Sequence, residues 1–288
     1  MKKNIKNIRF DLKKAPFGCE VLELEDFFKR LATWTYFGKT ERVHFFCVIV
    51  VTEGEGRHFV DFKEYHLEKG DILFVAPSQI QQYENSPYYK GYMLIFTEYF
   101  FRRQINELTL LSQSSIFDTT LPNALIKPDH ETFSKMVQLL LFLQAEFSSP
   151  HGFSKEESLQ KLTSLFLIYA EREKQRDSNS ISNDHYLSQY YHFKQLLEQH
   201  FKRERSVEFY ASLMAITPKT LCRITRSTIQ KSAKEFIDSR VVMEIKRLLL
   251  FEKLSIKEIA YSLHFNEPTN LVKYFKKHTG ETPTSYKG

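Results

Sequence analysis

Short apolar runs separated by polar turn sequences follow one another from Val43 to about Phe96. Most of the runs end at glycine, proline, aspartate or asparagine, which are typical turn residues. Runs of this length predict antiparallel strands joined as hairpins. The predicted strands are 44–51, 57–62, 65–67, 72–76 and 88–97, with turns at 52–56, 63–64, 68–71, 77–78 and 85–87.

The spacing of apolar residues changes to that of amphipathic helices between His130 and Arg176. Two stripes predict helices at 130–147 and 154–174, separated by the turn sequence 148–152. Because the stripes are wider than packing on a sheet requires, we expect these helices to join two copies of the chain; covering the sheet alone is the alternative. The stripes consist of Phe133, Met136, Val137, Leu140 and Leu143, and of Leu159, Leu162, Leu165, Phe166 and Tyr169.

A polar segment of small residues, 177–184, follows the second of these helices. Such a segment cannot build a packed element, and it predicts a domain boundary. The length of 288 residues also favours two domains, since a domain averages roughly 150 residues. We therefore expect an N-terminal domain at 1–176, a linker at 177–185 and a C-terminal domain at 186–288.

The expected C-terminal domain contains two copies of one motif. Residues 206–211 resemble residues 255–260, and each run precedes a turn and a second predicted helix. This is the layout of a helix-turn-helix, whose second helix enters the major groove of DNA. The two candidate recognition helices are about 218–228 and 268–278.

Local signals define where these helices begin and end. Ser255 and Glu258 form a capping box, in which a hydroxyl and a carboxylate bind the free amides at a helix start. Pro218 and Pro268 suit the first turn of a helix, where proline costs no backbone hydrogen bond. Gly280 suits the end of the second recognition helix.

The second copy and the residues after it resemble a known family. The residues concerned are Leu254 to Ala260, Phe265, Pro268, the run Lys273-Tyr274-Phe275-Lys276-Lys277-His278-Thr279-Gly280, and Thr282 to Tyr286. They are similar to the C-terminal signature of AraC/XylS-type transcription regulators. The resemblance implies two helix-turn-helix units joined by a helix at about 233–251, following an N-terminal cupin-like barrel. The expected fold class is α+β: an antiparallel β-barrel with two following helices, then an all-α domain.

Helix geometry assigns candidate contacts with DNA. Residues three or four apart share a face, so Leu221 and Ile224 face the core in the first recognition helix, as Leu271 and Phe275 do in the second. Arginine and lysine can pair with guanine and asparagine with adenine, whereas Lys276 is assigned to the phosphate backbone. Ordinary solvated charges are the alternative. The candidates are Lys219, Thr220, Arg223, Arg226, Thr269, Asn270, Lys273 and Lys276.

The sequence departs from the family pattern at several positions. His264 stands where the family usually has glycine. In the first copy Thr225 replaces a core aromatic residue, while Gln230 and Ala233 replace glycine and proline. These changes predict a first unit that is less rigid than the second or packed differently.

The N-terminal turn sequences resemble those of the small cupin-type barrel in which many regulators of this family bind an effector. The motifs are Gly54-x-Gly56 and Glu68-x-Gly70-Asp71-x5-Pro77. Metal-binding cupins gather several histidines, but His44 has no histidine two residues away and Gln81 stands where a later one is expected. Since amides are poor ligands for transition metals, we expect no metal and no cofactor. His58 and His66 are then polar residues of strands.

Five residues could line an effector pocket in the barrel. Aromatic faces suit a sugar or a hydrocarbon, and Arg42 suits an anion. Barrel core and rim are the alternative for each residue. The candidates are Trp34, Tyr36, Arg42, His44 and Phe46.

Charge and cysteine content indicate the expected partner and the location of the protein. Residues 1–185 carry 25 Asp and Glu against 23 Lys and Arg, whereas residues 186–288 carry 18 Lys and Arg against 10 Asp and Glu. A basic C-terminal domain attracts nucleic acid. The three cysteines are scattered, and no apolar run could span a bilayer, so we expect a cytoplasmic chain without disulfides.

The preferred hypothesis is a sequence-specific DNA-binding transcription regulator, with double-stranded DNA, a small-molecule effector, a second copy of the chain and RNA polymerase as partners. One alternative is a regulator whose barrel mediates only protein contacts. Another is a cupin enzyme with an accessory basic domain, which would need a metal triad or a nucleophile beside a base. The sequence contains neither, so we expect no enzymatic activity.

Overall fold

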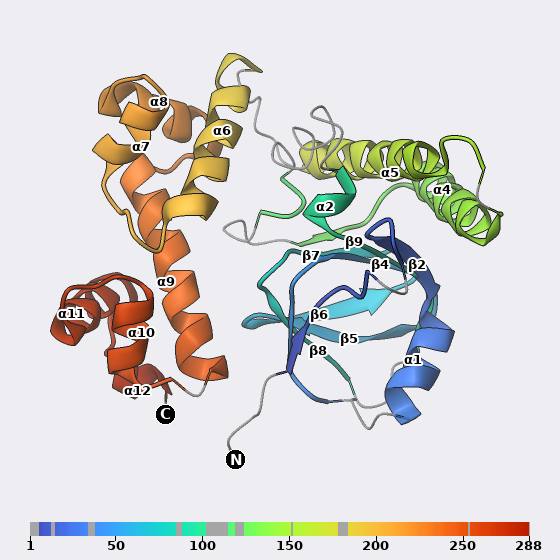
Figure 1. Ribbon diagram of the computed structural model, residues 1–288, viewed down its shortest axis with the longest axis horizontal. Helices are drawn as coiled ribbons and strands as arrows, with labels where there is room; N and C mark the ends of the chain where they lie inside the picture. Colours follow the sequence, from blue (N-terminus) through green and yellow to red (C-terminus); the bar gives the residue numbers. More distant parts are fainter. Residues whose placement is uncertain are drawn as a thin grey trace. The chain divides into compact units, whose positions relative to one another are not determined.

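The computed structural model describes residues 6–12, 15–33, 38–84, 88–101, 115–118, 124–150, 152–177, 184–252 and 254–287. The chain divides into two compact units, with the boundary between Asn179 and Ser180. The first unit is rich in strands, and the second is built from helices (Figure 1). Within the ranges given above, no helix has the length and apolar character needed to cross a membrane.

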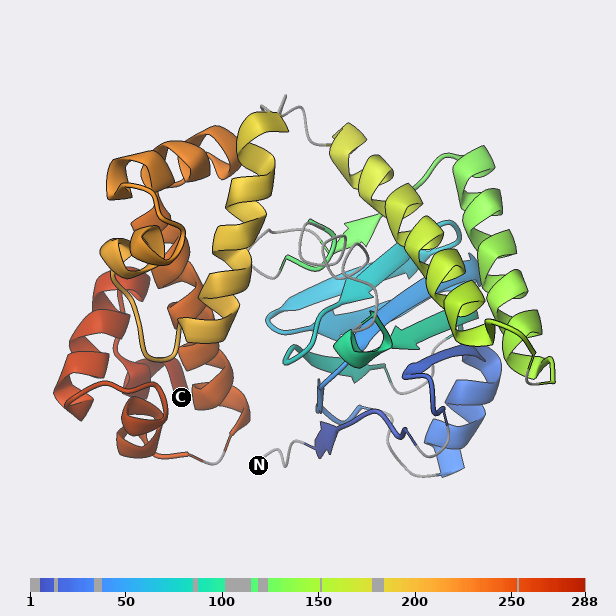
Figure 2. The same cartoon turned by 45° about the horizontal axis from the view of Figure 1, so that its top comes forward.

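The first unit contains two five-stranded sheets that face each other (Figure 2). Their inward side chains form one core, to which both sheets contribute, for example Ile49 and Val60. The first sheet has the order β1 (Lys6–Ile8), β3 (Glu41–Val43), β8 (Ile80–Tyr83), β5 (Glu55–Val60) and β6 (Lys63–Glu68). The second has the order β10 (Leu125–Ile126), β7 (Ile72–Val75), β4 (Phe46–Glu53), β9 (Lys90–Phe96) and β2 (Cys19–Glu23).

Helices cover the outer face of the second sheet. Alternate residues of β4 such as Val48 and Val50 pack in one cluster with Met136 and Phe166 of the two long helices. Strand β4 is therefore buried on both faces, which explains its nearly continuous apolar sequence. The helices of this unit within the described residues are α1 (Leu24–Thr33), α2 (Glu98–Phe101), α4 (His130–Ser148) and α5 (Lys155–Asp177).

The structure confirms the cupin-like fold and the two helices, but it corrects the predicted hairpins. Among the described strands only β5 and β6 pair as sequence neighbours, whereas β4 pairs with β7 and β9 of its own sheet. The chain crosses to the other sheet after β4, at Gly54, where an added Cβ would lie 2.0 Å from the Tyr88 carbonyl oxygen. The turn predicted at 63–64 lies at 61–62 instead, because Asp61 adopts a left-handed φ of 54° and Lys63 already pairs with Val60.

The second unit consists of helices around one central helix, α9 (Figure 1). Its core contains residues from all of its long helices, including Phe193, Leu221, Phe236 and Phe275. The predicted recognition helices and the joining helix are confirmed to within one residue. The helices are α6 (Asp184–His200), α7 (Val207–Leu213), α8 (Pro218–Ile229), α9 (Ala233–Phe251), α10 (Ile256–Ser262), α11 (Pro268–Thr279) and α12 (Pro283–Lys287).

Hydroxyl side chains define four of these helix starts. Ser206, Thr217, Ser232 and Ser255 each accept a hydrogen bond from a backbone N–H in the first turn of the helix that follows. Ser255 forms the predicted capping box with Glu258. Ser232 forms another, with the glutamate three residues later, which was not predicted. Each cap typically contributes about 1 kcal/mol.

Candidate functional sites

The first candidate site is the exposed face of α8. Leu221 and Ile224 are fully buried, as predicted, and fix the face of the helix that meets the core. Lys219, Arg223 and Arg226 are exposed on the other side, and Thr220 is half-buried. The guanidinium of Arg223 also lies 5.4 Å from the centre of a ring in α6, that of Tyr186.

The equivalent face of α11 presents a second group of polar residues. Leu271 and Phe275 are fully buried, again as predicted. Neither α8 nor α11 contains an acidic residue, so each presents an uninterrupted basic or amide-bearing face to solvent. The residues predicted for this face are all exposed: Thr269, Asn270, Lys273 and Lys276.

The same turn geometry sets both recognition helices against the helix before them. Ala215 and His264 have left-handed φ angles of 53° and 54°. One residue later, the N–H of Ile216 donates to the Ala211 carbonyl at 3.0 Å, and the N–H of Phe265 donates to the Ala260 carbonyl at 2.9 Å. His264 therefore occupies a position where glycine avoids a steric cost, which explains the family preference.

The basic residues of the joining helix include one that is structural. Arg240 is buried and makes two hydrogen bonds to the Glu198 carboxylate of α6, at 2.7 and 3.0 Å. Its guanidinium also lies 3.9 Å from the centre of the Phe201 ring. Arg240 thus holds α6 to α9 and is not available to bind DNA.

The three predicted effector residues that the structure describes do not lie on one surface. Trp34 and Tyr36 lie outside the described residues. His44 is exposed, and its Nε2 lies 2.9 Å from Asn7 Oδ1. Phe46 belongs to the cluster beneath the helices and stacks on Phe96, so it faces away from the core between the sheets. Arg42 is buried in β3.

A different group of polar residues lies in the core between the sheets. His58, Gln81, Tyr83 and Tyr89 are almost fully buried. His58 Nε2 and Gln81 Oε1 are 3.2 Å apart, and the His58 and Tyr83 rings meet edge to face at 4.6 Å. Nδ1 of His58 and the hydroxyls of both tyrosines have no hydrogen-bond partner among the described residues. Phe28 packs its ring against both tyrosine rings.

Burial determines the charge state of this group. It lowers the pKa of His58 to about 4, against a smaller raising effect of the hydrogen bond with Gln81. It raises the pKa of Glu41 on neighbouring β3 to about 7. At neutral pH the imidazole and the phenols are therefore uncharged. An unsatisfied buried polar group costs about 1–3 kcal/mol, so three together indicate a place for a polar ligand or water.

These residues do not form a metal site. Among the described residues, no group of three or more histidine, cysteine, aspartate or glutamate side chains could hold a metal ion. The predicted strand position of His58 is confirmed, whereas the buried hydroxyls of Tyr83 and Tyr89 were not predicted. Their signal was weak, because an inward tyrosine in a strand looks like core.

Comparisons with known proteins agree with this division of the chain. Residues 210–288 match the family model described as a helix-turn-helix domain, and residues 27–167 match the AraC-like ligand binding domain. The chain is 24% identical over 251 residues to the Msm operon regulatory protein of Streptococcus mutans, covering 87% of this chain and 86% of that protein. It is 22% identical over 239 residues to the lactose operon transcription activator of Staphylococcus xylosus, covering 83% and 82%.

Two solved structures are also similar to parts or most of this chain. ToxT from Vibrio cholerae, solved with a bound unsaturated fatty acid, is 14% identical with a TM-score of 0.40, covering 93% of this chain and 94% of that chain. The DNA-binding domain of AdpA in complex with a target DNA is 23% identical with a TM-score of 0.30, covering 33% of this chain and 86% of that chain.

A cupin-like ligand-binding domain followed by a domain with two helix-turn-helix units defines a DNA-binding transcription regulator. The chain belongs to the AraC/XylS family of transcription regulators.

Proposed function

We propose that α8 and α11 of one chain bind successive major-groove segments on one face of the duplex, about one helical turn or ~34 Å apart. The observation that carries this proposal is that both helices expose a face without acidic residues while their apolar faces share one core. Arg223 and Lys273 would bind base edges, and Lys276 would bind a phosphate. The remaining candidates, Thr220 among them, would supplement these contacts.

The test begins with selection of bound fragments from random DNA, which supplies an operator. Arg223→Ala and Lys273→Ala should each weaken operator binding by about 1–3 kcal/mol and relax base preference at two positions about ten base pairs apart. Lys276→Ala should weaken binding to all sequences and lower the salt dependence by about one unit of slope. Lys29→Ala, which removes one exposed charge from α1, is the matched control. Unchanged affinity and base preference in Arg223→Ala would contradict the proposal for α8.

The same proposal assigns effector control to the barrel. His58, Tyr83 and Tyr89 are uncharged, lie beside an aromatic ring and each have a polar atom without a partner in the described part of the chain, which suits a neutral ligand with several hydroxyl groups. One relative is named for a lactose operon, which agrees with a sugar. Trp34, Tyr36 and Arg42 remain predicted lining residues.

Thermal unfolding of the full chain with a panel of neutral mono- and disaccharides tests this assignment. A bound sugar should raise the unfolding temperature, and Tyr89→Phe should weaken its binding by about tenfold, since it removes one buried hydrogen bond. Tyr99→Phe, at an exposed tyrosine, is the control. The absence of stabilisation by any member of the panel would favour the alternative in which the barrel mediates only protein contacts.

The proposal further includes a homodimer formed through α4 and α5 and an activating contact with RNA polymerase, without enzymatic activity. Leu141, Phe142 and Leu165 are exposed apolar residues of these helices, which supports the dimer. One relative is named as a transcription activator, which supports the contact with the polymerase. Equilibrium sedimentation of the full chain should find dimers at micromolar concentration, and Phe142→Glu should shift it towards monomer. A monomer at these concentrations would contradict the dimer.

A further inference from the structure

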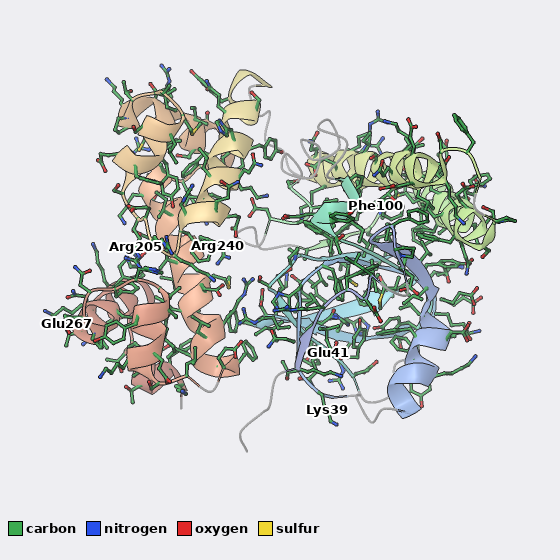
Figure 3. The ribbon with its side chains drawn as sticks, in the orientation of Figure 1. Lys39, Glu41, Phe100, Arg205, Arg240 and Glu267 are labelled. Carbon is green, nitrogen blue, oxygen red and sulfur yellow. The ribbon has the colours of Figure 1, made fainter. Side chains whose placement is uncertain are left out.

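A side chain immediately before the first helix-turn-helix unit contacts the second unit. Arg205 lies in the loop between α6 and α7, immediately before the first unit. Its Nη2 donates to the carbonyl oxygen of Leu263, at the end of α10, and its guanidinium lies 3.8 Å from the centre of the Phe265 ring in the turn before α11. Figure 3 labels Arg205 between the α7–α8 pair and the α10–α11 pair.

A second set of contacts fixes α11 to the start of α9. Asp238 is buried, and its Oδ1 accepts hydrogen bonds from the Tyr274 hydroxyl of α11 and from Lys234 Nζ of α9, each at 2.6 Å. Burial, and then the hydrogen bond with Asp238, raises the pKa of Tyr274, so its hydroxyl stays a donor at neutral pH. His278 Nε2 lies 3.5 Å from the other oxygen of Asp238.

Lys234 links the contacts of Arg205 to the contacts of Asp238. Its Nζ donates to the carbonyl oxygen of Arg205 at 3.2 Å as well as to Asp238. The Tyr274 ring also packs against the Phe265 ring, with their centres 5.5 Å apart. The loop before the first unit, the start of α9 and the second unit therefore form one connected network.

This network adds a constraint that the joining helix alone does not provide. Both units pack on α9, which spans 19 residues, so the shared core already restricts how each unit is oriented. Contacts between Arg205 and the turn of the second unit further oppose rotation of the two units against each other. When the two units have a fixed relative orientation, the second recognition helix binds DNA without a further loss of conformational entropy in the protein. The fixed orientation also means that both helices fit only half-sites at one separation.

We infer that Arg205, Asp238 and Tyr274 are positioning residues that make this regulator specific for operators with one spacing between the two half-sites. The inference rests on the proposed function, in which α8 and α11 both bind bases. The ligand class is duplex DNA that carries two half-sites in a fixed helical phase.

The experiment measures the affinity of the full-length chain for the selected operator and for versions with one, two or five base pairs added between the half-sites. The wild-type chain should prefer the selected spacing by about tenfold or more. Tyr274→Phe and Arg205→Gln should each reduce this preference to about threefold or less. Affinity for DNA carrying a single half-site should stay within about twofold of the wild-type value.

Two controls separate positioning from general stability. Tyr286→Phe removes a tyrosine hydroxyl from the same unit, at a ring that packs on Phe275 and has no contact with Asp238 among those described, and it should leave the spacing preference unchanged. Circular dichroism of each variant reports whether the helices remain folded. Arg205→Lys keeps the charge but loses the planar stacking on Phe265, so it should also relax the preference.

Three results would overturn the inference. These are a wild-type chain without a spacing preference, variants with an unchanged preference, and variants that lose affinity equally at every spacing. Its failure is distinct from failure of the proposed function. The latter appears as unchanged base preference in Arg223→Ala and Lys273→Ala, whatever the spacing profile.

Discussion

In the first helix-turn-helix unit Gln230 caps the end of α8 with a φ of 57°, and in the second Gly280 caps the end of α11 with a φ of 84°. Both residues are left-handed, a conformation that glycine adopts without cost and glutamine does not. The backbone of the first unit therefore follows the same path as that of the second and adopts a less favourable residue conformation at this position. Glutamine in place of the family glycine at position 230 therefore keeps the geometry of this helix end but makes its backbone conformation less favourable.

The two units also differ inside their cores and at their helix starts. Thr225 is buried where Phe275 is buried in the second unit, and its hydroxyl donates to the Cys222 carbonyl at 3.2 Å. Thr217 caps α8 with its side chain, whereas Glu267 makes no such bond at α11. The first unit thus has the better cap on its recognition helix, and the second has the larger core residue. That the first unit is less rigid stays a prediction.

The largest expected effect concerns the buried pair. Phe275→Ala should lower the free energy of unfolding of the helical unit by about 3–5 kcal/mol, because it leaves a cavity that the ring had filled. Thr225→Ala removes far less volume and should cost about 1 kcal/mol. Denaturant unfolding followed by far-ultraviolet circular dichroism measures both. Equal losses would show that the two positions contribute alike to the core.

The left-handed helix ends should respond in opposite directions. Gly280→Ala should destabilise the helical unit by about 1 kcal/mol, since no atom crowds the position and only the backbone conformation is penalised. Gln230→Gly should stabilise it by up to about 1 kcal/mol for the same reason. The matched pair is compared by thermal unfolding in one buffer. A loss of stability in Gln230→Gly would mean that the glutamine side chain makes a compensating contact.

The smallest effect is a difference in acid sensitivity between the units. The hydrogen bonds with Ser255 lower the pKa of Glu258, so this carboxylate stabilises the folded state above its ordinary pKa and the contribution is lost as the pH falls through the folded value. The first unit has Phe209 at the equivalent position and lacks such a group. Glu258→Gln should therefore reduce the loss of stability below pH ~4.5. Unfolding midpoints measured across that range test this, with Glu208→Gln as the control.

Several features of the chain follow from the sequence alone. Helix starts depend on residues next to one another, so Ser255, Glu258, Pro218 and Pro268 identify them without knowledge of the fold. The period of apolar residues likewise identified the buried faces of both recognition helices and of α4, whereas in α5 Leu165 of the predicted stripe is exposed and Leu167 is buried instead. These are local properties, set by hydrogen bonds within one turn and by the geometry of the helix itself.

Tertiary structure decided the rest, because it depends on which distant segments meet. Strand β4 is apolar on both faces, so its pattern cannot tell that Phe46 faces the helices while Cys47 faces the core between the sheets. Strand β4 pairs with β9 and not with β5, and the sequences of such short strands do not specify which partner is taken. The contact of Arg205 with Leu263 joins residues 58 positions apart, and only the folded unit brings them together.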